Sequence, residues 1–335
     1  KYIFFLILKK FILYGKLDIE IGNDPVKSIV GQLDGPNIHI QILNLKHLFL
    51  IVRSPELSFG ELYMNKELKI KKGNLEDLMK FLMLNYNSWQ STNFGKIRKY
   101  LNDLKNFFST FNPIKKAKRN AAHHYDLNDD LFESFLDKRR QYSCGFFYSK
   151  NESLEDAQIN KVSRLVAKLQ INKGNTVLDI GCGWGGLGLS IYNCNPSTRI
   201  TGITLSEKQH IYFNQLIKKN KLTGKVECLL KDYRELDNEY DRIVSVGMLE
   251  HVGHHNFEKF FQFIENHLKP KGVAVIHSIG RYGLPAHTNP WLEKYIFPGG
   301  YIPTFSQMTN AIEKTSLKIT DIEVMRLHYA ETLKK

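Results

Sequence analysis

The segment Thr176–Gly186 reads TVLDIGCGWGG and decides the fold. A short apolar run that contains one carboxylate, Asp179, is followed by a turn with four glycines. Glycine permits φ > 0 and lets a ligand approach the backbone closely. A strand, a glycine turn and a helix predict a nucleotide-like ligand at the carboxyl edge of a parallel sheet. The spacing D-x-G-x-G-x-G differs from the dinucleotide fingerprint G-x-G-x-x-G, and favours a ligand with a positive centre and no pyrophosphate.

The length, net charge and cysteine pattern of the chain limit the class of protein. A chain of 335 residues is long enough for two domains, and a formal net charge of +13 indicates an anionic partner, either nucleic acid or a negatively charged membrane surface. The four cysteines form no C-x-x-C pair, which favours a reduced cytosolic protein without a disulfide framework or a zinc site, so no metal is expected. The apolar and basic N-terminus is too short to span a bilayer and lacks a signal-peptide cleavage site, which predicts a buried or interfacial helix.

Residues 1–90 read as a small α+β domain. Alternating apolar runs at Asn37–Leu43 and Leu48–Val52 indicate strands, and Asn74–Met83 resembles a capped helix. The domain carries no catalytic constellation, and scaffold and lipid- or membrane-binding roles both remain open. Residues 91–121 combine helical apolar spacing with many lysines and arginines, which predicts a basic helical linker. Its charges fit either a solvated face or binding to anionic headgroups.

Residues 122–335 alternate between strand and helix patterns. Strands are expected at 176–180, 199–205, 226–230, 241–247, 272–279 and 317–324, and helices at 207–220, 257–268 and 307–315. Such alternation predicts an α/β fold with a doubly wound parallel sheet.

The glycine pattern resembles motif I of S-adenosylmethionine (AdoMet) methyltransferases. Six further motifs follow the expected order around it: QYSCGFF, GITLSEKQ, DYREL, SVGMLEHVG, YIFPGGYIP and HYAETL. Over its whole length the chain is similar to the cyclopropane-fatty-acyl-phospholipid synthases, a family shared with the mycolic acid cyclopropane synthases. The resemblance implies a class I methyltransferase Rossmann-like sheet, a smaller N-terminal α+β domain and a catalytic domain at 122–335. The implied reaction transfers a methylene from AdoMet to the cis double bond of unsaturated acyl chains in membrane phospholipids.

The resemblance also implies the site residues and cofactors. Bicarbonate accepts the proton that leaves as the ring closes, and its implied ligands are Cys144, Glu250, His277, Ile279 and Tyr329, with Cys144 and Ile279 acting through backbone N–H groups. The implied AdoMet contacts are Tyr142, Ser143, Val177, Asp179, Gly181, Gly183, Gly185, Thr204, Leu205, Ser206, Gln209, Asp232, Tyr233 and Val246. Asp232 is placed to accept from the adenine amino group. Ser206 followed by Gln209 also fits a helix capping box, and both roles can hold together.

The implied partner is an anionic phospholipid surface with unsaturated acyl chains. The protein is therefore expected to be cytoplasmic and peripherally membrane-associated, and a homodimer is a further expectation. A nucleic-acid methyltransferase also fits the charge, but the sequence contains no recognisable RNA-reading module.

Two departures from the family pattern stand out. Asn128-Asp129 replaces the usual Gly-Asn, a turn that Asn tolerates because it can adopt the αL conformation. The chain stops shortly after Tyr329, where family members continue into further helices and a last antiparallel strand, so the sequence is expected to be a fragment.

Three other readings remain open. A coclaurine-type N-methyltransferase of small amines shares much of the catalytic domain, but His277, Tyr329 and the N-terminal domain argue against it. A membrane-binding protein with a vestigial methyltransferase domain is disfavoured by the intact glycine loop and Glu250. Related enzymes that add a methyl or methylene branch to the same alkene are poorly separated by these motifs.

Overall fold

A computed structural model describes residues 2–90 and 129–335 of the chain. The predicted linker at 91–121 and Asn128 lie outside the described residues. The chain divides into two compact units: residues 1–109 with 287–296, and residues 110–286 with 297–335. The sequence did not assign the segment 287–296 to the first unit.

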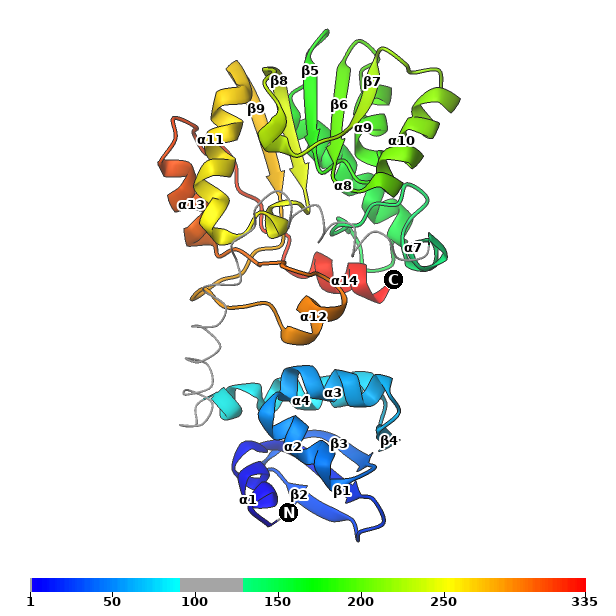
Figure 1. Ribbon diagram of the computed structural model, residues 1–335, viewed down its shortest axis with the longest axis vertical. Helices are drawn as coiled ribbons and strands as arrows, with labels where there is room; N and C mark the ends of the chain where they lie inside the picture. The colour runs from blue at the N-terminus through cyan, green and yellow to red at the C-terminus, as the bar shows by residue number, and fades with distance from the viewer. Residues whose placement is uncertain (1, 91–128) are drawn as a thin grey trace. The chain divides into compact units, whose positions relative to one another are not determined.

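The first unit is built on a four-stranded mixed sheet (Figure 1). Its strands are β1 (Tyr14–Ile21), β2 (Lys27–Val30), β3 (Leu33–Ile42) and β4 (Leu68–Lys72), in the order β2-β1-β3-β4. Strands β1 and β3 run parallel, and the other pairs are antiparallel. Ile38, Ile40 and Ile42 of β3 are each 1% exposed, because alternate residues of a strand point to the same face. The strand predicted at Asn37–Leu43 is confirmed.

Helices α1 (Tyr2–Phe11), α2 (Leu45–Arg53), α3 (Pro55–Met64) and α4 (Leu75–Gln90) also belong to this unit. The strand predicted at Leu48–Val52 is wrong, because this run belongs to α2. The side chain of Asn44 accepts from the backbone N–H of Lys46 and caps the helix. Leu48 and Ile51 are buried while Phe49 is 71% exposed, so the burial follows a helical and not an alternating period.

The N-terminal helix α1 is partly buried. Phe4, Phe5 and Leu8 pack against the core of the first unit, as the sequence predicted for a buried or interfacial helix. No helix within residues 2–90 or 129–335 combines the length and the apolar character needed to cross a membrane.

Asn85 connects α4 to the start of β1. Its Oδ1 accepts from the backbone N–H groups of Leu13 (2.7 Å) and Tyr14 (3.0 Å), and its Nδ2 donates to the carbonyl oxygens of Tyr14 (3.1 Å) and Phe81 (2.9 Å). Asn85→Leu is expected to destabilise the first unit by about 2 kcal/mol, because it removes the partners of buried backbone groups. Urea unfolding measures the change. Lys80→Ala on the same helix, at an exposed position, should change the free energy of unfolding by less than about 0.5 kcal/mol. Equal effects of the two substitutions would contradict the assigned role of Asn85.

The segment that contains α12 (Pro290–Tyr295) packs against α3 within the first unit. Glu61 accepts from Lys294 Nζ (2.5 Å) and from the Tyr295 hydroxyl (2.8 Å), and these hydrogen bonds lower the pKa of Glu61. The Trp291 ring lies so close to Gly60 that a Cβ at that position would come within 2.4 Å of it. Gly60 therefore makes room for the indole.

The second unit is built on a five-stranded parallel sheet. Its strands are β5 (Thr176–Ile180), β6 (Arg199–Thr204), β7 (Val226–Leu230), β8 (Tyr240–Val246) and β9 (Leu268–His277), in the order β7-β6-β5-β8-β9. All neighbouring strands pair in parallel. The strand order reverses beside β5, so the glycine turn that follows β5 lies where such sheets bind ligands.

Helices cover both faces of this sheet (Figure 1). One face packs against α8 (Leu154–Leu169), α9 (Gly186–Cys194) and α10 (Glu207–Lys219), and the other against α11 (Phe257–His267) and α13 (Phe305–Glu313). Val177 faces the first helix layer, and Leu178 and Ile180 face the second. Two short helices, α7 (Asp129–Phe135) and α14 (His328–Lys334), complete the described elements. The doubly wound sheet predicted from the sequence is confirmed.

The strand predicted at 317–324 is wrong. These residues form no ladder, and Ile319, Ile322 and Val324 are exposed by 44%, 53% and 56%. Ion pairs hold the segment instead: Arg164 with Glu323, and Lys168 with Asp321 and Glu323. An alternating sequence becomes a strand only where a neighbouring strand supplies hydrogen-bond partners, and none of the described strands pairs with this segment.

Candidate functional site

The glycine loop after β5 is shaped by close packing on both sides. Gly185 has φ +87°, and a Cβ there would come within 2.1 Å of the Phe213 ring on α10. A Cβ on Gly186 would come within 2.5 Å of the carbonyl oxygen of Arg139. Both positions therefore require glycine, the first for its backbone conformation and the second for the approach of another segment.

A cavity opens at this loop. Eleven of the fourteen predicted AdoMet contacts line it: Tyr142, Ser143, Asp179, Gly181, Gly183, Thr204, Leu205, Gln209, Asp232, Tyr233 and Val246. The other three are placed elsewhere: Val177 lies in the hydrophobic core, Gly185 lies under Phe213, and Ser206 caps α10.

The loop after β6 contributes Thr204 and Gln209 to the cavity. Thr204 Oγ1 donates to Gln209 Oε1 at 2.7 Å, which fixes both side chains. Ser206 Oγ accepts from the backbone N–H of Gln209 at 3.3 Å, the N-cap bond that the sequence left as an alternative to a ligand contact. The capping role of Ser206 is thus confirmed.

Asp232 lies at the end of β7 and is 2% exposed. Its two carboxylate oxygens accept from Arg234, with Nε–Oδ1 and Nη2–Oδ2 distances of 2.7 Å each. This bidentate contact holds the carboxylate in one orientation at the cavity wall. Its predicted role as an acceptor for adenine stays a prediction.

Asp179 is buried at the start of the glycine loop. Its Oδ2 has no hydrogen-bond partner among the described residues. Burial raises the pKa of Asp179 to about 7, while the charge of Lys161 opposes the shift. An acceptor in this position suits a cationic ligand group, because a positive charge would compensate the cost of keeping the carboxylate ionised.

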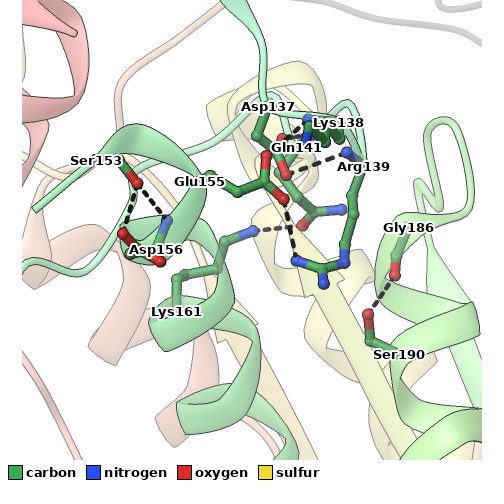
Figure 2. A network of polar contacts seen from close by, with 10 residues as sticks. All are labelled: Asp137, Lys138, Arg139, Gln141, Ser153, Glu155, Asp156, Lys161, Gly186 and Ser190. Atoms are coloured by element: carbon green, nitrogen blue, oxygen red, sulfur yellow. Dashed lines mark hydrogen bonds and ion pairs between the residues drawn. The ribbon is translucent and has the colours of Figure 1, made fainter.

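A buried lysine holds the segment that carries Tyr142, Ser143 and Cys144. Lys161 Nζ, from the middle of α8, donates to Gln141 Oε1 at 2.5 Å (Figure 2). It also donates to Ser143 Oγ at 3.0 Å. Lys161 is 2% exposed, and burial lowers its pKa to about 8.

The rest of this polar network fixes the backbone beside Lys161. Asp137 accepts from the backbone N–H of Gln141 at 2.6 Å (Figure 2), and Gln158 Nε2 donates to the carbonyl oxygen of Ser143 at 2.8 Å. Burying a lysine ammonium costs free energy, and the hydrogen bonds by which Lys161 orients other groups offset part of this cost.

Glu250 and Ile279 meet next to the cavity. Glu250 Oε1 accepts from the backbone N–H of Ile279 at 2.6 Å, and Glu250 Oε2 is buried without a partner among the described residues. Burial raises the pKa of Glu250 to about 7, and the bond from Ile279 opposes the shift. The N–H that the resemblance assigned to bicarbonate is therefore donated to Glu250 in this structure.

His277, Cys144 and Tyr329 are the other three predicted anion ligands. Burial raises the pKa of Tyr329, and the charges of Glu250 and Cys144 add to the shift, so the phenol is within electrostatic range of both. His277 ends β9, its Nδ1 is buried without a partner among the described residues, and burial lowers its pKa to about 4. Burial raises the pKa of the Cys144 thiol to about 11. Among the five predicted anion ligands, Glu250 is bonded to the backbone of Ile279 and Tyr329 lies near Glu250 and Cys144. The bicarbonate-binding role of the five residues stays a prediction.

Helix α14 places Tyr329 by holding the segment after Cys144. Thr332 Oγ1 accepts from the backbone N–H of Gly145 (2.9 Å), and His328 Nδ1 accepts from that of Phe147 (3.0 Å). The His328 ring also stacks on Phe146, with centroids 4.4 Å apart. The helix and the segment therefore support each other.

Sequence reasoning missed Arg140, which lines the cavity. Trp184 and His251 also line it: the first lies in the loop Val177–Gly185 that the resemblance assigned to AdoMet, and the second was expected at the cofactor's edge of the sheet. Trp184 lies inside the quoted glycine turn and His251 directly follows Glu250, so their positions offered a signal. Arg140 directly precedes the quoted motif QYSCGFF, but its contacts with Trp184 and Tyr212 depend on packing between segments far apart in the chain. Within the described ranges, no three His, Cys, Asp or Glu side chains gather closely enough to hold a metal ion.

The sheet order, the helices on both faces and the glycine loop after β5 define a class I methyltransferase fold. The profile of the family described as "Mycolic acid cyclopropane synthetase" matches residues 113–335, and the chain belongs to this family.

Three relatives illustrate the similarity. The cyclopropane-fatty-acyl-phospholipid synthase of Escherichia coli strain K12 is 40% identical over 200 residues, which are 59% of this chain and 50% of that protein. The chain therefore spans about half the length of that relative. The solved cyclopropane synthase MmaA2 of Mycobacterium tuberculosis has a TM-score of 0.62 at 32% identity, covering 67% of this chain and 82% of that one. CmaA1 complexed with SAH and CTAB has a TM-score of 0.61 at 30% identity, with the same coverage.

Proposed function

We propose that this chain is an AdoMet-dependent cyclopropane-fatty-acyl-phospholipid synthase, which adds a methylene to the cis double bond of unsaturated acyl chains and uses bicarbonate as the proton acceptor. The observation that carries the proposal is Glu250, which directly precedes His251 of the cavity lining, accepts from the backbone N–H of Ile279 and leaves its Oε2 buried without a partner among the described residues. Family membership and the E. coli relative support the same reaction.

The cavity residues fit AdoMet. The ligand carries a sulfonium, an ammonium, a carboxylate, a ribose and an adenine, and the lining offers both buried acceptors and buried donors for them. The Oδ2 of Asp179 and the Nε1 of Trp184 lack partners among the described residues, and a polar ligand would satisfy both. The relative CmaA1 was solved with SAH, the demethylated product of AdoMet. Bound AdoMet supplies an electrophilic methyl group.

The second cluster fits bicarbonate, a small anion that both accepts and donates hydrogen bonds. The partnerless atoms Glu250 Oε2 and His277 Nδ1 are buried, and the raised pKa of Tyr329 keeps its hydroxyl protonated as a donor. Bound bicarbonate supplies a base for the proton released on ring closure. Hydrogen bonds from groups held in a fixed arrangement stabilise a bound anion strongly in a site that excludes water.

The chain's own residues have distinct tasks in this proposal. Glu250, with a pKa of about 7, exists in both protonation states near neutrality and can hold or release a proton at Oε2. His277 stays neutral at that pH because burial lowers its pKa to about 4. Lys161 orients Ser143 and Gln141, and α14 orients Tyr329 through its bonds to Gly145 and Phe147.

The activity is tested with labelled AdoMet and vesicles of unsaturated phosphatidylglycerol. We expect the acyl chains to gain the mass of one CH2 group and the olefinic proton signals to give way to cyclopropane signals in NMR spectra. Vesicles of saturated lipid are the control and should take up no label. An acyl chain that keeps its double bond and gains a methyl or methylene branch would contradict cyclopropane formation. Label found only in small amines would favour the N-methyltransferase reading.

Removal of bicarbonate is a second test of the same proposal. In degassed, carbonate-free buffer the rate of lipid labelling should fall at least about tenfold, because a positioned base typically accounts for 10²–10⁴ of a rate. Added bicarbonate should restore the rate, whereas chloride at equal ionic strength should not. A rate independent of bicarbonate would remove the anion from the mechanism.

The proposal includes a peripheral position on the cytoplasmic face of an anionic membrane. The formal charge of +13 supports it, as do exposed apolar side chains of the first unit, such as Phe49 at 71% and Met83 at 66%. We expect co-sedimentation with phosphatidylglycerol vesicles, and much less with phosphatidylcholine vesicles. Equal binding to both would remove the electrostatic part of the proposal. The expected homodimer remains a prediction, which light scattering after size-exclusion chromatography tests.

A further inference from the structure

Arg140 stands out among the residues that line the cavity. Its guanidinium lies against two aromatic rings that are nearly perpendicular to each other, 4.9 Å from the centroid of Trp184 and 4.5 Å from that of Tyr212. Its side chain is 11% exposed, and it forms an ion pair with Glu133 through Nη2. Because the two rings and Glu133 together hold the guanidinium, its N–H groups point in defined directions.

Two buried donors at this place lack partners. Nη1 of Arg140 and Nε1 of Trp184 make no hydrogen bond with any described residue, although both residues line the cavity. A buried donor without an acceptor costs free energy, so the pair indicates an acceptor that binds from the cavity. The second arginine of the lining, Arg234, differs because its guanidinium is bound in bidentate fashion to Asp232.

The chemistry of the ligand selects the acceptor. AdoMet contains one anionic group, the α-carboxylate of its methionine part, and a carboxylate offers oxygens to two donors at once. The Asp179 carboxylate, on the same lining, provides the complementary acceptor for the ammonium of the same amino acid. The contact with Glu133 does not compete strongly, because Glu133 is 60% exposed and its pair is screened by water.

We propose that Arg140 and Trp184 form a subsite for the α-carboxylate of AdoMet and of its product SAH. This inference rests on the AdoMet-binding part of the proposed function, and it adds the residues that distinguish a ligand with an amino-acid end from one without it. The Arg140 guanidinium supplies the positive charge and one donor, and the Trp184 indole N–H supplies the second donor. Glu133 and Tyr212 act as positioning residues, because they touch Arg140 and not the ligand.

The test compares two ligands by calorimetry. SAH carries the amino acid, whereas 5′-methylthioadenosine shares its adenosine and thioether but lacks the carboxylate and ammonium. Arg140→Met should weaken SAH binding by about 10- to 100-fold, the range expected for one charged hydrogen bond. Its affinity for 5′-methylthioadenosine should stay within about twofold of the wild type, which also reports that the variant is folded.

Matched variants sharpen the test. Arg139→Met removes a neighbouring arginine that pairs with Glu155 and does not line the cavity, and it should change neither affinity. Trp184→Phe keeps an aromatic ring beside the guanidinium but removes the N–H donor. It should weaken SAH binding by several-fold and leave the affinity for 5′-methylthioadenosine unchanged. If Arg140→Met weakens both ligands equally, or neither, the subsite is overturned. If the wild-type protein binds no SAH, the proposed function fails and the subsite fails with it.

Discussion

Glu250→Gln is expected to lower the turnover of lipid methylation about a thousandfold, while SAH affinity changes by less than about threefold. Glutamine keeps an oxygen that can accept from Ile279 N–H, so the local geometry is preserved. It cannot hold or release a proton at the partnerless position, which is the task assigned to Glu250 Oε2. Initial rates with unsaturated vesicles and calorimetry with SAH measure the two quantities separately.

Tyr329→Phe serves as the companion to this variant. It should lower turnover about a hundredfold with SAH affinity again retained, since in the proposed function the phenol donates to bicarbonate and does not contact the cofactor. A parallel loss of SAH affinity in either variant would count against the roles assigned to these side chains.

The same substitution at Glu250 has a stability signature. The folded pKa of about 7 lies above the ordinary value of 4.5, so the wild type loses stability as pH rises from 4.5 to 7. Glutamine does not titrate, and the variant should therefore gain roughly 2–3 kcal/mol relative to the wild type across this window. Chemical unfolding at pH 4.5 and pH 8 measures the gain and establishes that the variant is folded.

The second large effect is expected at Lys161. Lys161→Met removes the donor to Gln141 and Ser143, and should weaken SAH binding about tenfold through the displaced segment. It should also remove a pH dependence. The folded pKa of about 8 lies below the ordinary value of 10.5, so the wild type gains stability as pH rises from 8 toward 10.5. From pH 8 to 9.5, the wild type should gain about 2 kcal/mol relative to the variant.

Asp179 adds to this difference with the same sign. The charge of Lys161 lowers the pKa of Asp179, and without it the carboxyl would titrate higher and destabilise the variant further in alkaline solution. Lys173→Met, at an exposed position between α8 and β5, is the control and should show no pH-dependent difference from the wild type. If the difference in the free energy of unfolding between wild type and Lys161→Met stayed constant from pH 8 to 9.5, burial of the Lys161 ammonium would not destabilise the fold.

The sequence predicted the sheet of the second unit well, because each parallel strand there is a compact apolar run and β5, β6 and β8 are followed by helix patterns. It failed at Leu48–Val52 and at 317–324 for related reasons. Alternation along a short run is shared by strands and by some helices, and only the Asn44 cap or a missing neighbour strand decides between them. The presence of a neighbouring strand is a property of the tertiary structure, and the local sequence pattern does not contain it.

The candidate site was predictable where one motif supplies both a turn and its ligand contacts. The glycine loop, Thr204 and Gln209 line the cavity as expected. Arg140 could not be predicted, because its role arises from Trp184 and Tyr212, which come from two other segments. The bond from Ile279 to Glu250 was equally hidden, since a backbone N–H carries no sequence signature.

The docking of α12 on α3 has a consequence for any attempt to divide the protein. A chain cut between residues 90 and 129 does not release an independent C-terminal half, since residues 287–296 belong with the first unit. The C-terminal piece would keep Trp291, Lys294 and Tyr295 but lose their partners on α3. The chain passes from the first unit into the second, returns to the first at residues 287–296 and then completes the second, so no single cut separates the two units.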